Sequence, residues 1–251
     1  MKPVSDAVTV RFLGSGDAFG SGGRFQTCIS VRSTGANLLL DCGASSLIAM
    51  RRFGVAPAEI KSIVLSHLHG DHFGGIPFFI LDAQFFSPRE VPLTIAGPAG
   101  AESRIKEAME VLFPGSSATK QKFETHFVEF SDRVPIQVDA ATVTPFEVVH
   151  SSGAAAYALR LNVGGKTIVY SGDTEWCDAL LDAASGADLF ICEAYFFERA
   201  VRYHLDYRTL MGNLPRIDCQ RLVLTHLNSD MLAHLGDVDV EIAADGLEIT
   251  L

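Results

Sequence analysis

Seven consecutive residues, Ser66-His67-Leu68-His69-Gly70-Asp71-His72, include four side chains that can bind a metal ion. Neutral imidazole and carboxylate are donors that suit zinc, manganese or iron, and the absence of thiolate argues against a closed structural zinc site. On an extended backbone His67, His69 and Asp71 would share one face. The glycines at 70, 74 and 75 let the chain curl, so that Asp71 and His72 serve a second centre. The spacing therefore predicts two adjacent metal ions and a catalytic site.

Four metal donors follow directly after expected strands. Open α/β architectures place ligand groups in loops at strand ends, and four such ends that carry metal donors are hard to obtain by chance. The pattern therefore indicates that these donors converge on one site. They are His67, His150, Asp173 and His226, after the strands expected at 61–65, 142–149, 166–170 and 221–225.

The stretch 66–72 resembles the His-x-His-x-Asp-His signature of the metallo-β-lactamase superfamily, a set of hydrolases with an αβ/βα sandwich fold. Taken position by position, the resemblance implies one metal ion held by His67, His69 and His150. It implies a second ion held by Asp71, His72 and His226, with Asp173 bridging the two. Asp71 is therefore also expected among the catalytic residues. Zinc is the first choice for both divalent ions, with manganese or iron as alternatives.

Several other stretches are similar to the ribonuclease Z branch of that superfamily, among them Gly14-Ser15-Gly16 and Leu40-Asp41-Cys42-Gly43. Asp41 either orients a ligand histidine or caps a helix at 45–53. Glu193-Ala194 and the downstream His204 also resemble ribonuclease Z. The His-x-Asp formed by His204 and Asp206 is similar to the phosphodiesterase of the carbon-phosphorus lyase pathway. His204 is our candidate general acid, and a structural histidine capped by Asp206 is the alternative.

The order of expected elements predicts an α/β protein. Strands and then helices occur twice, which fits two similar halves packed as a four-layer αβ/βα sandwich, with two mixed sheets inside and helices outside. A chain of 251 residues, 48% hydrophobic and 20% charged, fits one globular domain over residues 1–251. Strands are also expected at 8–13, 26–32, 37–40, 91–96, from 123, and at 155–163, 188–192, 238–242 and 247–251, with helices at 45–53, 76–86, 101–113, 176–184, 207–214 and shortly after 226.

Charge and cysteine content restrict the partners and the compartment. A net charge of −10 opposes non-specific attraction to nucleic acid or anionic membrane. Five scattered cysteines without a Cys-x-x-Cys pair fit reduced, buried thiols. Residues 1–6 have no secretory core, and no uncharged run approaches membrane-spanning length, so we expect a cytoplasmic protein. Arginines at 199, 202, 208, 216 and 221 either hold an anionic substrate or form a solvated helix face.

Two adjacent cations lower the pKa of a shared water, so that hydroxide exists near neutral pH and attacks the substrate. The favoured activity is hydrolysis of small phosphodiesters, such as cyclic or nucleotide-derived phosphates. Ribonuclease Z carries a long tRNA-gripping arm, but residues 151–172 provide only enough chain for one hairpin. Structured RNA is therefore a disfavoured substrate.

Three alternatives to this activity remain open at this point. They are a metal-dependent thioester, lactone or other ester hydrolase, ribonuclease Z-like RNA processing, and a non-catalytic binding protein on the same fold. The helix expected at 76–86 is apolar nearly all round, which favours core packing. A pocket wall or a subunit contact is its other explanation, and a homodimer is therefore possible.

Overall fold

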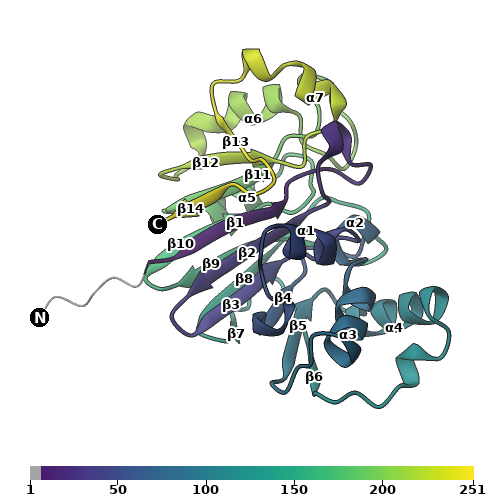
Figure 1. Ribbon diagram of the computed structural model, residues 1–251. Coiled ribbons are helices and arrows are strands. Elements are labelled where there is room, and N and C mark those ends of the chain that lie inside the picture. The colour runs from purple at the N-terminus through teal and green to yellow at the C-terminus, as the bar shows by residue number, and fades with distance from the viewer. Residues whose placement is uncertain (1–6) are drawn as a thin grey trace, which may run out of the picture.

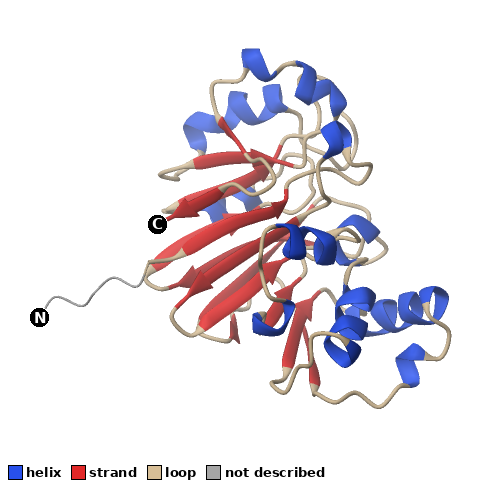
Figure 2. Ribbon diagram, viewed as in Figure 1, coloured by secondary structure: helices blue, strands red, loops and turns tan. Residues whose placement is uncertain are grey.

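The computed structural model describes residues 7–251, so the expectation for residues 1–6 lies outside the described part of the chain. Within it, two sheets of seven strands pack against each other, and helices cover their outer faces (Figure 1; Figure 2). One hydrophobic cluster lies between the two sheets. Each of the other two lies between one sheet and the helices that cover it. The predicted four-layer α/β fold is confirmed.

The first sheet has the strand order β14-β1-β2-β3-β4-β5-β6. Its antiparallel start was predicted and is present, and the strands from β3 to β6 are parallel. The run Leu38-Leu39-Leu40 shows why such strands are apolar throughout: Leu38 and Leu40 enter the core between the sheets, and Leu39 faces the helices. The strands are β1 (Thr9–Gly14), β2 (Cys28–Ser33), β3 (Ala36–Leu40), β4 (Ser62–Val64), β5 (Leu93–Gly97), β6 (Thr125–Glu129) and β14 (Glu248–Thr250).

The second sheet has the order β13-β12-β11-β10-β9-β8-β7. Its strands from β7 to β10 are antiparallel, and those from β10 to β13 are parallel. Gly164 and Gly165 have φ of 55° and 75°, as the predicted tight hairpin between β9 and β10 requires. The strands are β7 (Ile136–Val138), β8 (Ala141–Val148), β9 (Ala156–Val163), β10 (Lys166–Tyr170), β11 (Leu189–Glu193), β12 (Leu222–Thr225) and β13 (Glu241–Ile242).

The helices follow the predicted order, but one of them begins later than expected. The helix expected from 176 begins only at Ala179, because the backbone at Thr174 and Glu175 is hydrogen-bonded to Glu193 and to the carbonyl of Val149. Across residues 7–251, no helix combines the length and apolar character needed to cross a bilayer. The helices are α1 (Ser46–Arg52), α2 (Gly70–Phe73), α3 (Ile76–Phe85), α4 (Ala101–Leu112), α5 (Ala179–Ala184), α6 (Tyr207–Asn213) and α7 (Ser229–Ala233).

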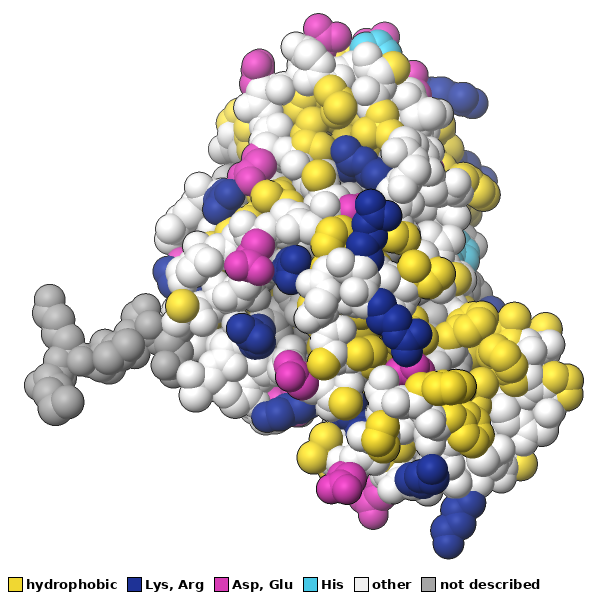
Figure 3. Space-filling model, viewed as in Figure 1, with side chains coloured by type: hydrophobic (Ala, Val, Ile, Leu, Met, Phe, Trp, Pro, Cys, Tyr) yellow, Lys and Arg dark blue, Asp and Glu magenta, His cyan; other side chains and the backbone are white. Residues whose placement is uncertain are grey.

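The apolar helix α3 is buried except along one side, with seven of its ten residues buried. Ile76 and Phe79 are fully buried, but Phe78, Phe85 and Phe86 are exposed by 37%, 60% and 81%. Figure 3 shows hydrophobic side chains gathered on the surface over α3 and α4. Core packing therefore explains most of the apolar sequence of α3, as predicted, and the remaining apolar side chains lie on the surface.

All five cysteines are free thiols, as predicted. Cys28, Cys42 and Cys192 are buried, and burial raises the pKa of Cys28 to about 12. Cys177 and Cys219 are only half-buried, so the expectation that every cysteine is a core residue was wrong for these two.

We predict that Gly75→Ala destabilises the fold. A Cβ atom at Gly75 would lie 2.2 Å from the carbonyl oxygen of Gly43 and 2.9 Å from that of Cys42. Backbone must move to relieve this overlap, so we expect the free energy of unfolding to fall by about 1–3 kcal/mol, measured by denaturant titration. The control is Gly212→Ala in α6, where nothing lies within 4 Å and alanine should stabilise the helix by roughly 0.5–1 kcal/mol. Equal stability of the two variants would contradict the steric explanation.

Candidate metal centre

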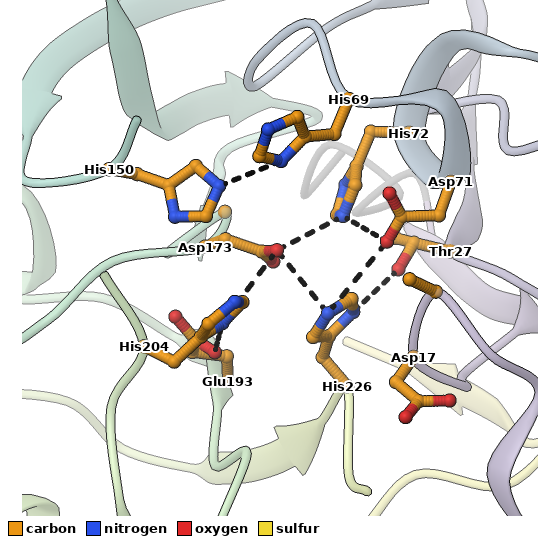
Figure 4. Close-up of polar contacts among 12 residues, drawn as sticks. Asp17, Thr27, His69, Asp71, His72, His150, Asp173, Glu193, His204 and His226 are labelled. Atoms are coloured by element: carbon orange, nitrogen blue, oxygen red, sulfur yellow. Dashed lines mark hydrogen bonds and ion pairs between the residues drawn. The ribbon is translucent and has the colours of Figure 1, made fainter. Parts of the chain in front are cut away.

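The seven expected metal donors lie together at one edge of the sandwich. His67 follows β4, and His150, Asp173 and His226 follow β8, β10 and β12, so the prediction that they stand at strand ends is confirmed. Figure 4 shows the side chains of six of them facing a common centre: His69, Asp71, His72, His150, Asp173 and His226. Two groups have their potential ligand atoms within 4.8 Å of one another. One is His67, His69 and His150, and the other is Asp71, His72, Asp173 and His226.

The backbone of the signature stretch differs from the extended strand that the sequence suggested. His69 is extended, but Gly70–Phe73 form the helical turn α2, which places Asp71 with His72 instead of beside His69. The extended face expected for Asp71 was therefore wrong, and the curl that brings it to the second group was right. Gly74 has a φ of −64°, which any residue can adopt, so its backbone conformation does not require glycine. Space does require it, because a Cβ atom there would lie 2.3 Å from the carbonyl oxygen of Gly70.

Asp173 lies at the middle of the cluster. Its Oδ2 is 3.3 Å from Nε2 of both His72 and His226, and 3.8 Å from Nε2 of His67. Asp173 is 2% exposed, so these contacts are made almost out of water. Although burial opposes the charged form, His226 and His72 lower the pKa of Asp173 well below its usual range, and the carboxylate is therefore charged.

Hydrogen bonds at the outer nitrogen fix the orientation of four imidazoles. A histidine that donates Nδ1–H to an outer acceptor keeps the Nε2 lone pair free for a metal ion. His69 is the exception, because its Nδ1 lies 3.0 Å from Nε2 of His150. The Nδ1 atoms of the other four contact Ser66 Oγ (from His67), Asp41 Oδ2 (from His72), the Tyr203 carbonyl (from His150) and Thr27 Oγ1 (from His226), at 2.7–3.2 Å.

Asp41 contacts one of the clustered histidines, as one of its two proposed roles requires. Its Oδ2 lies 2.7 Å from Nδ1 of His72, and its carboxylate also accepts bonds from the backbone and hydroxyl of Ser66. Ser45, not Asp41, precedes the first residue of α1, so the capping alternative was wrong.

Backbone strain is concentrated at the same place. Asp41, Tyr203 and His226 have φ of 58°, 71° and 58°, a region that non-glycine residues rarely adopt. Each such residue costs on the order of 1–3 kcal/mol and is typical of functional sites. All three either belong to the cluster or hold one of its histidines.

The residues present fit metal ions. Among the described residues, His67 Nε2, His72 Nε2 and Asp173 Oδ1 are buried without a hydrogen-bond partner. Such atoms each cost about 1–3 kcal/mol unless a ligand satisfies them. Burial lowers the pKa of His67 well below its usual value, which leaves a neutral imidazole as metal ligands require. Burial opposes charge on His72 too, but Asp173, Asp71 and Asp41 raise its pKa, so the centre favours positive charge.

His204 and Glu193 form a pair beside the cluster. Nδ1 of His204 lies 3.0 Å from Oε2 of Glu193 and 3.9 Å from Oδ2 of Asp173. Burial disfavours the charged imidazole, but the bond to Glu193 and the charge of Asp173 outweigh it and raise the pKa of His204 to about 9. His150, Asp173 and His204 also form a third group with metal-ligand spacing, so geometry alone leaves His204 two roles.

Sequence reasoning missed some residues of the centre. Glu193 is fully buried, and it appeared in the sequence only as part of a resembling stretch. Glu193 is the last residue of the apolar strand β11. A polar side chain at a strand end was the sign used for the other donors, and it would have indicated Glu193 as well. Nothing in the sequence singles out Thr27, which contacts His226, or Tyr195, whose ring stacks on His204 at 4.4 Å.

The remaining histidines and arginines lie outside the cluster. His126 is exposed, and His234 is half-buried against Phe197. Three of the five arginines pair with carboxylates, and the other two lie over the rings of Phe196 and Tyr203. The ion pairs are Arg208 with Glu198, Arg216 with Asp178 and Arg221 with Glu241, and the stacked arginines are Arg199 and Arg202.

Comparison with known proteins agrees with this fold and site. A ribonuclease Z of Methanosarcina acetivorans is 28% identical, over 88% of this chain and 87% of its own. The metallo-β-lactamase fold protein YhfI from Bacillus subtilis superposes with a TM-score of 0.78 and 25% identity, over 98% of this chain and all of its own. A diphosphatase of the PhnP family superposes with a TM-score of 0.76 at 18% identity, over 96% and 97% of the two chains.

The fold and the site define a metal-dependent hydrolase of the metallo-β-lactamase superfamily, in its ribonuclease Z- and PhnP-like branch. The superfamily and branch expected from the signature are confirmed, and so is the enzyme class. Within that superfamily the chain belongs to the family described as anti-Pycsar protein Apyc1, whose model matches residues 8–241.

Proposed function

We propose that the protein is a dinuclear metal-dependent phosphodiesterase that acts on small phosphodiesters, such as cyclic or nucleotide-derived phosphates. The main supporting observation is that a histidine held by a buried carboxylate, His204 with Glu193, lines the same cavity as Asp71, Asp173 and His226. The cavity thus combines an anion-binding centre with a group that can supply a proton to a departing alkoxide.

In this proposal His67, His69 and His150 hold one ion, and Asp71, His72 and His226 hold the other, with Asp173 shared by both. Zinc is the first choice, because imidazole and carboxylate donors suit it, and manganese or iron would also be accepted. When bound, two such ions activate water as a nucleophile and neutralise charge on the phosphoryl oxygens. Because donors come from both sheets, we also propose that the chain works as a single domain.

His204 is the proposed general acid. Its Nδ1 is bonded to Glu193, which leaves Nε2 for the leaving oxygen of the substrate. Glu193 is a positioning residue: it fixes the imidazole ring and favours its protonated form. Burial alone would raise the pKa of Asp71, but His72 and His226 lower it to about 2. Asp71 therefore stays ionised throughout and keeps the second group of ligands anionic.

A small substrate suits the cavity better than structured RNA. The cavity has a volume of about 300 Å³, at the lower end of the range for small-molecule sites. The residues between His150 and Asp173 form the β9–β10 hairpin, as the sequence indicated, and the chain carries a net charge of −10. Both features count against ribonuclease Z-like processing, which requires a large anionic partner to be held.

The principal alternative is an acyl hydrolase on the same metal centre, because the same activated water can attack a thioester or a lactone. A panel of bis(p-nitrophenyl) phosphate, purine and pyrimidine 3′,5′-cyclic nucleotides, lactones and thioesters separates the two. We expect turnover of the diesters, with kcat/KM of the cyclic nucleotides at least about 100-fold above that of the acyl substrates, because a diester with an alkoxide leaving group uses a general acid and phosphoryl-oxygen neutralisation together.

The panel should be run on protein as purified and after restoring zinc, manganese or iron, which also identifies the preferred ion. Turnover restricted to acyl substrates would refute the phosphodiesterase proposal. The homodimer considered from the sequence stays a prediction, tested by the mass of the protein in solution.

A further inference from the structure

An exposed aromatic side chain lies at the mouth of the catalytic cavity. Phe19 is 85% exposed and lines the same cavity as His69, His204 and His226. Exposure of so large an apolar side chain forfeits most of the roughly 1.5–3 kcal/mol that burial would provide. A phenylalanine at this place therefore requires an explanation.

The loop that carries Phe19 is fixed on both sides of it. The buried carboxylate of Asp17 accepts hydrogen bonds from the backbone and the hydroxyl of Ser21, each 2.8 Å long. The side-chain amide of Gln26 donates to the carbonyl of Ala18 at 2.9 Å. Because the residues on either side are anchored, the loop holds the ring in solvent beside the cavity.

The rest of the cavity lining shows what kind of group the ring can meet. Apart from the metal donors and His204, the cavity is lined by Ala18, Phe19, Gly70 and Tyr195. No lysine or arginine is among its lining residues, so the cavity offers neither side chain to a second anionic group of the substrate. Tyr195 stacks on His204 and adds a second aromatic ring to the lining.

The cavity continues past Phe19 into a second hollow. This hollow, of about 380 Å³, shares Ala18 and Phe19 with the catalytic cavity. It is also lined by Ile48, which is 64% exposed, and by the polar side chains of Gln26 and Ser45. Arg24 lines it too, and its guanidinium donates a hydrogen bond to the carbonyl of Ala243. An apolar floor with polar groups at its side suits a heteroaromatic ring that carries exocyclic oxygen and nitrogen atoms, and suits an alkyl chain poorly.

We propose that Phe19 stacks on the nucleobase of a nucleotide substrate whose phosphodiester lies at the metal centre. The inference rests on the proposed phosphodiesterase function and extends it, because it assigns the recognition of the base to one residue outside the metal cluster. Stacking of a base on an aromatic side chain tolerates different bases, since every base has a π face. Phe19 therefore selects nucleotides over other diesters without selecting one base.

Equilibrium binding of two matched ligands to the metal-loaded protein tests this role without turnover. Adenosine 5′-monophosphate and ribose 5-phosphate share the sugar and the phosphate and differ by the base, and calorimetry gives both dissociation constants. We expect wild-type protein to bind the nucleotide roughly 5- to 100-fold more tightly. Phe19→Ala should abolish that ratio through weaker nucleotide binding, and Phe19→Trp should retain it. The control is Phe86→Ala, which removes a similarly exposed phenylalanine from outside the cavity and should leave the ratio unchanged.

The outcomes separate this inference from the proposed function. A ratio that persists in Phe19→Ala, or wild-type protein that binds both ligands equally or binds neither, overturns the role of Phe19, whatever the activity. A ratio that depends on Phe19 in a protein that hydrolyses no phosphodiester would support the base subsite and refute the proposed reaction. Hydrolysis of diesters by a protein that binds adenosine 5′-monophosphate no more tightly than ribose 5-phosphate would support the proposed reaction and refute the base subsite.

Discussion

Asp173→Asn should abolish hydrolysis and remove metal from the protein. The substitution keeps the shape of the side chain but removes its negative charge, and Oδ2 of Asp173 lies within 3.8 Å of Nε2 of His67, His72 and His226. An amide that presents an N–H group to these imidazoles cannot replace a carboxylate that addresses two cations. We expect kcat/KM to fall by at least about 10³-fold, in line with the loss of a principal electrostatic group.

Metal analysis distinguishes loss of the ions from loss of the fold. About two ions per chain are expected in wild-type protein and fewer than one in Asp173→Asn. The matched control is Asp188→Asn, because Asp188 also flanks a strand of the second sheet, where it accepts a hydrogen bond from the backbone of Thr167, but lies outside both groups of donors. If Asp173→Asn keeps two ions and more than a tenth of the activity, Asp173 does not bridge them.

His204→Ala should slow hydrolysis without removing metal, and the effect should depend on the leaving group. A general acid contributes about 10²- to 10⁴-fold when the departing oxygen needs a proton. We therefore expect kcat to fall by that factor for a cyclic nucleotide, whose leaving group is an alkoxide. For bis(p-nitrophenyl) phosphate the loss should be less than about tenfold, because nitrophenolate departs without protonation.

Glu193→Gln tests the same pair through the pH profile. The bond to Glu193 and the charge of Asp173 raise the pKa of His204 to about 9, against the effect of burial. A general acid must be protonated, so activity declines as pH rises through the pKa of His204. Removal of the carboxylate charge lowers that pKa, and the basic limb of kcat should move to lower pH in Glu193→Gln.

The control for both variants is His126→Ala, an exposed histidine on β6. Loss of metal from His204→Ala would instead identify His204 as a ligand, in the third group that it forms with His150 and Asp173. Equal losses for alkoxide and nitrophenolate leaving groups would also exclude the acid role.

The strand framework was predictable because its signals are local. The strands β1 to β4 and the hairpin of β9 and β10 carry alternation or continuous apolar runs bounded by turn residues. The metal donors were predictable for a related reason, since each one follows such a run. The turn α2 was missed because its four residues are too few to show a helical period.

Tertiary contacts decided what the sequence left open. Only the folded chain shows that Asp41 reaches His72 and not a helix terminus, or that Arg216 and Arg221 are neutralised by carboxylates far along the chain. Phe19 carries no local signal either, because its proposed role depends on its exposure beside the cavity, which only the folded chain shows. Such properties depend on which segments become neighbours in space, and no short-range pattern encodes that.

The position of β14 has a consequence for biosynthesis. This strand pairs with β1, and just before it Asp245 binds the backbone of Ser15 and Phe25 on either side of the loop that carries Phe19. A ribosome makes β1 early, yet its neighbour and the brace for this loop emerge only with residues 245–250. The nascent chain therefore holds an unfinished sheet edge until residues 245–250 have emerged. A product interrupted shortly before that point would carry every metal donor and still lack a properly braced entrance to its catalytic cavity.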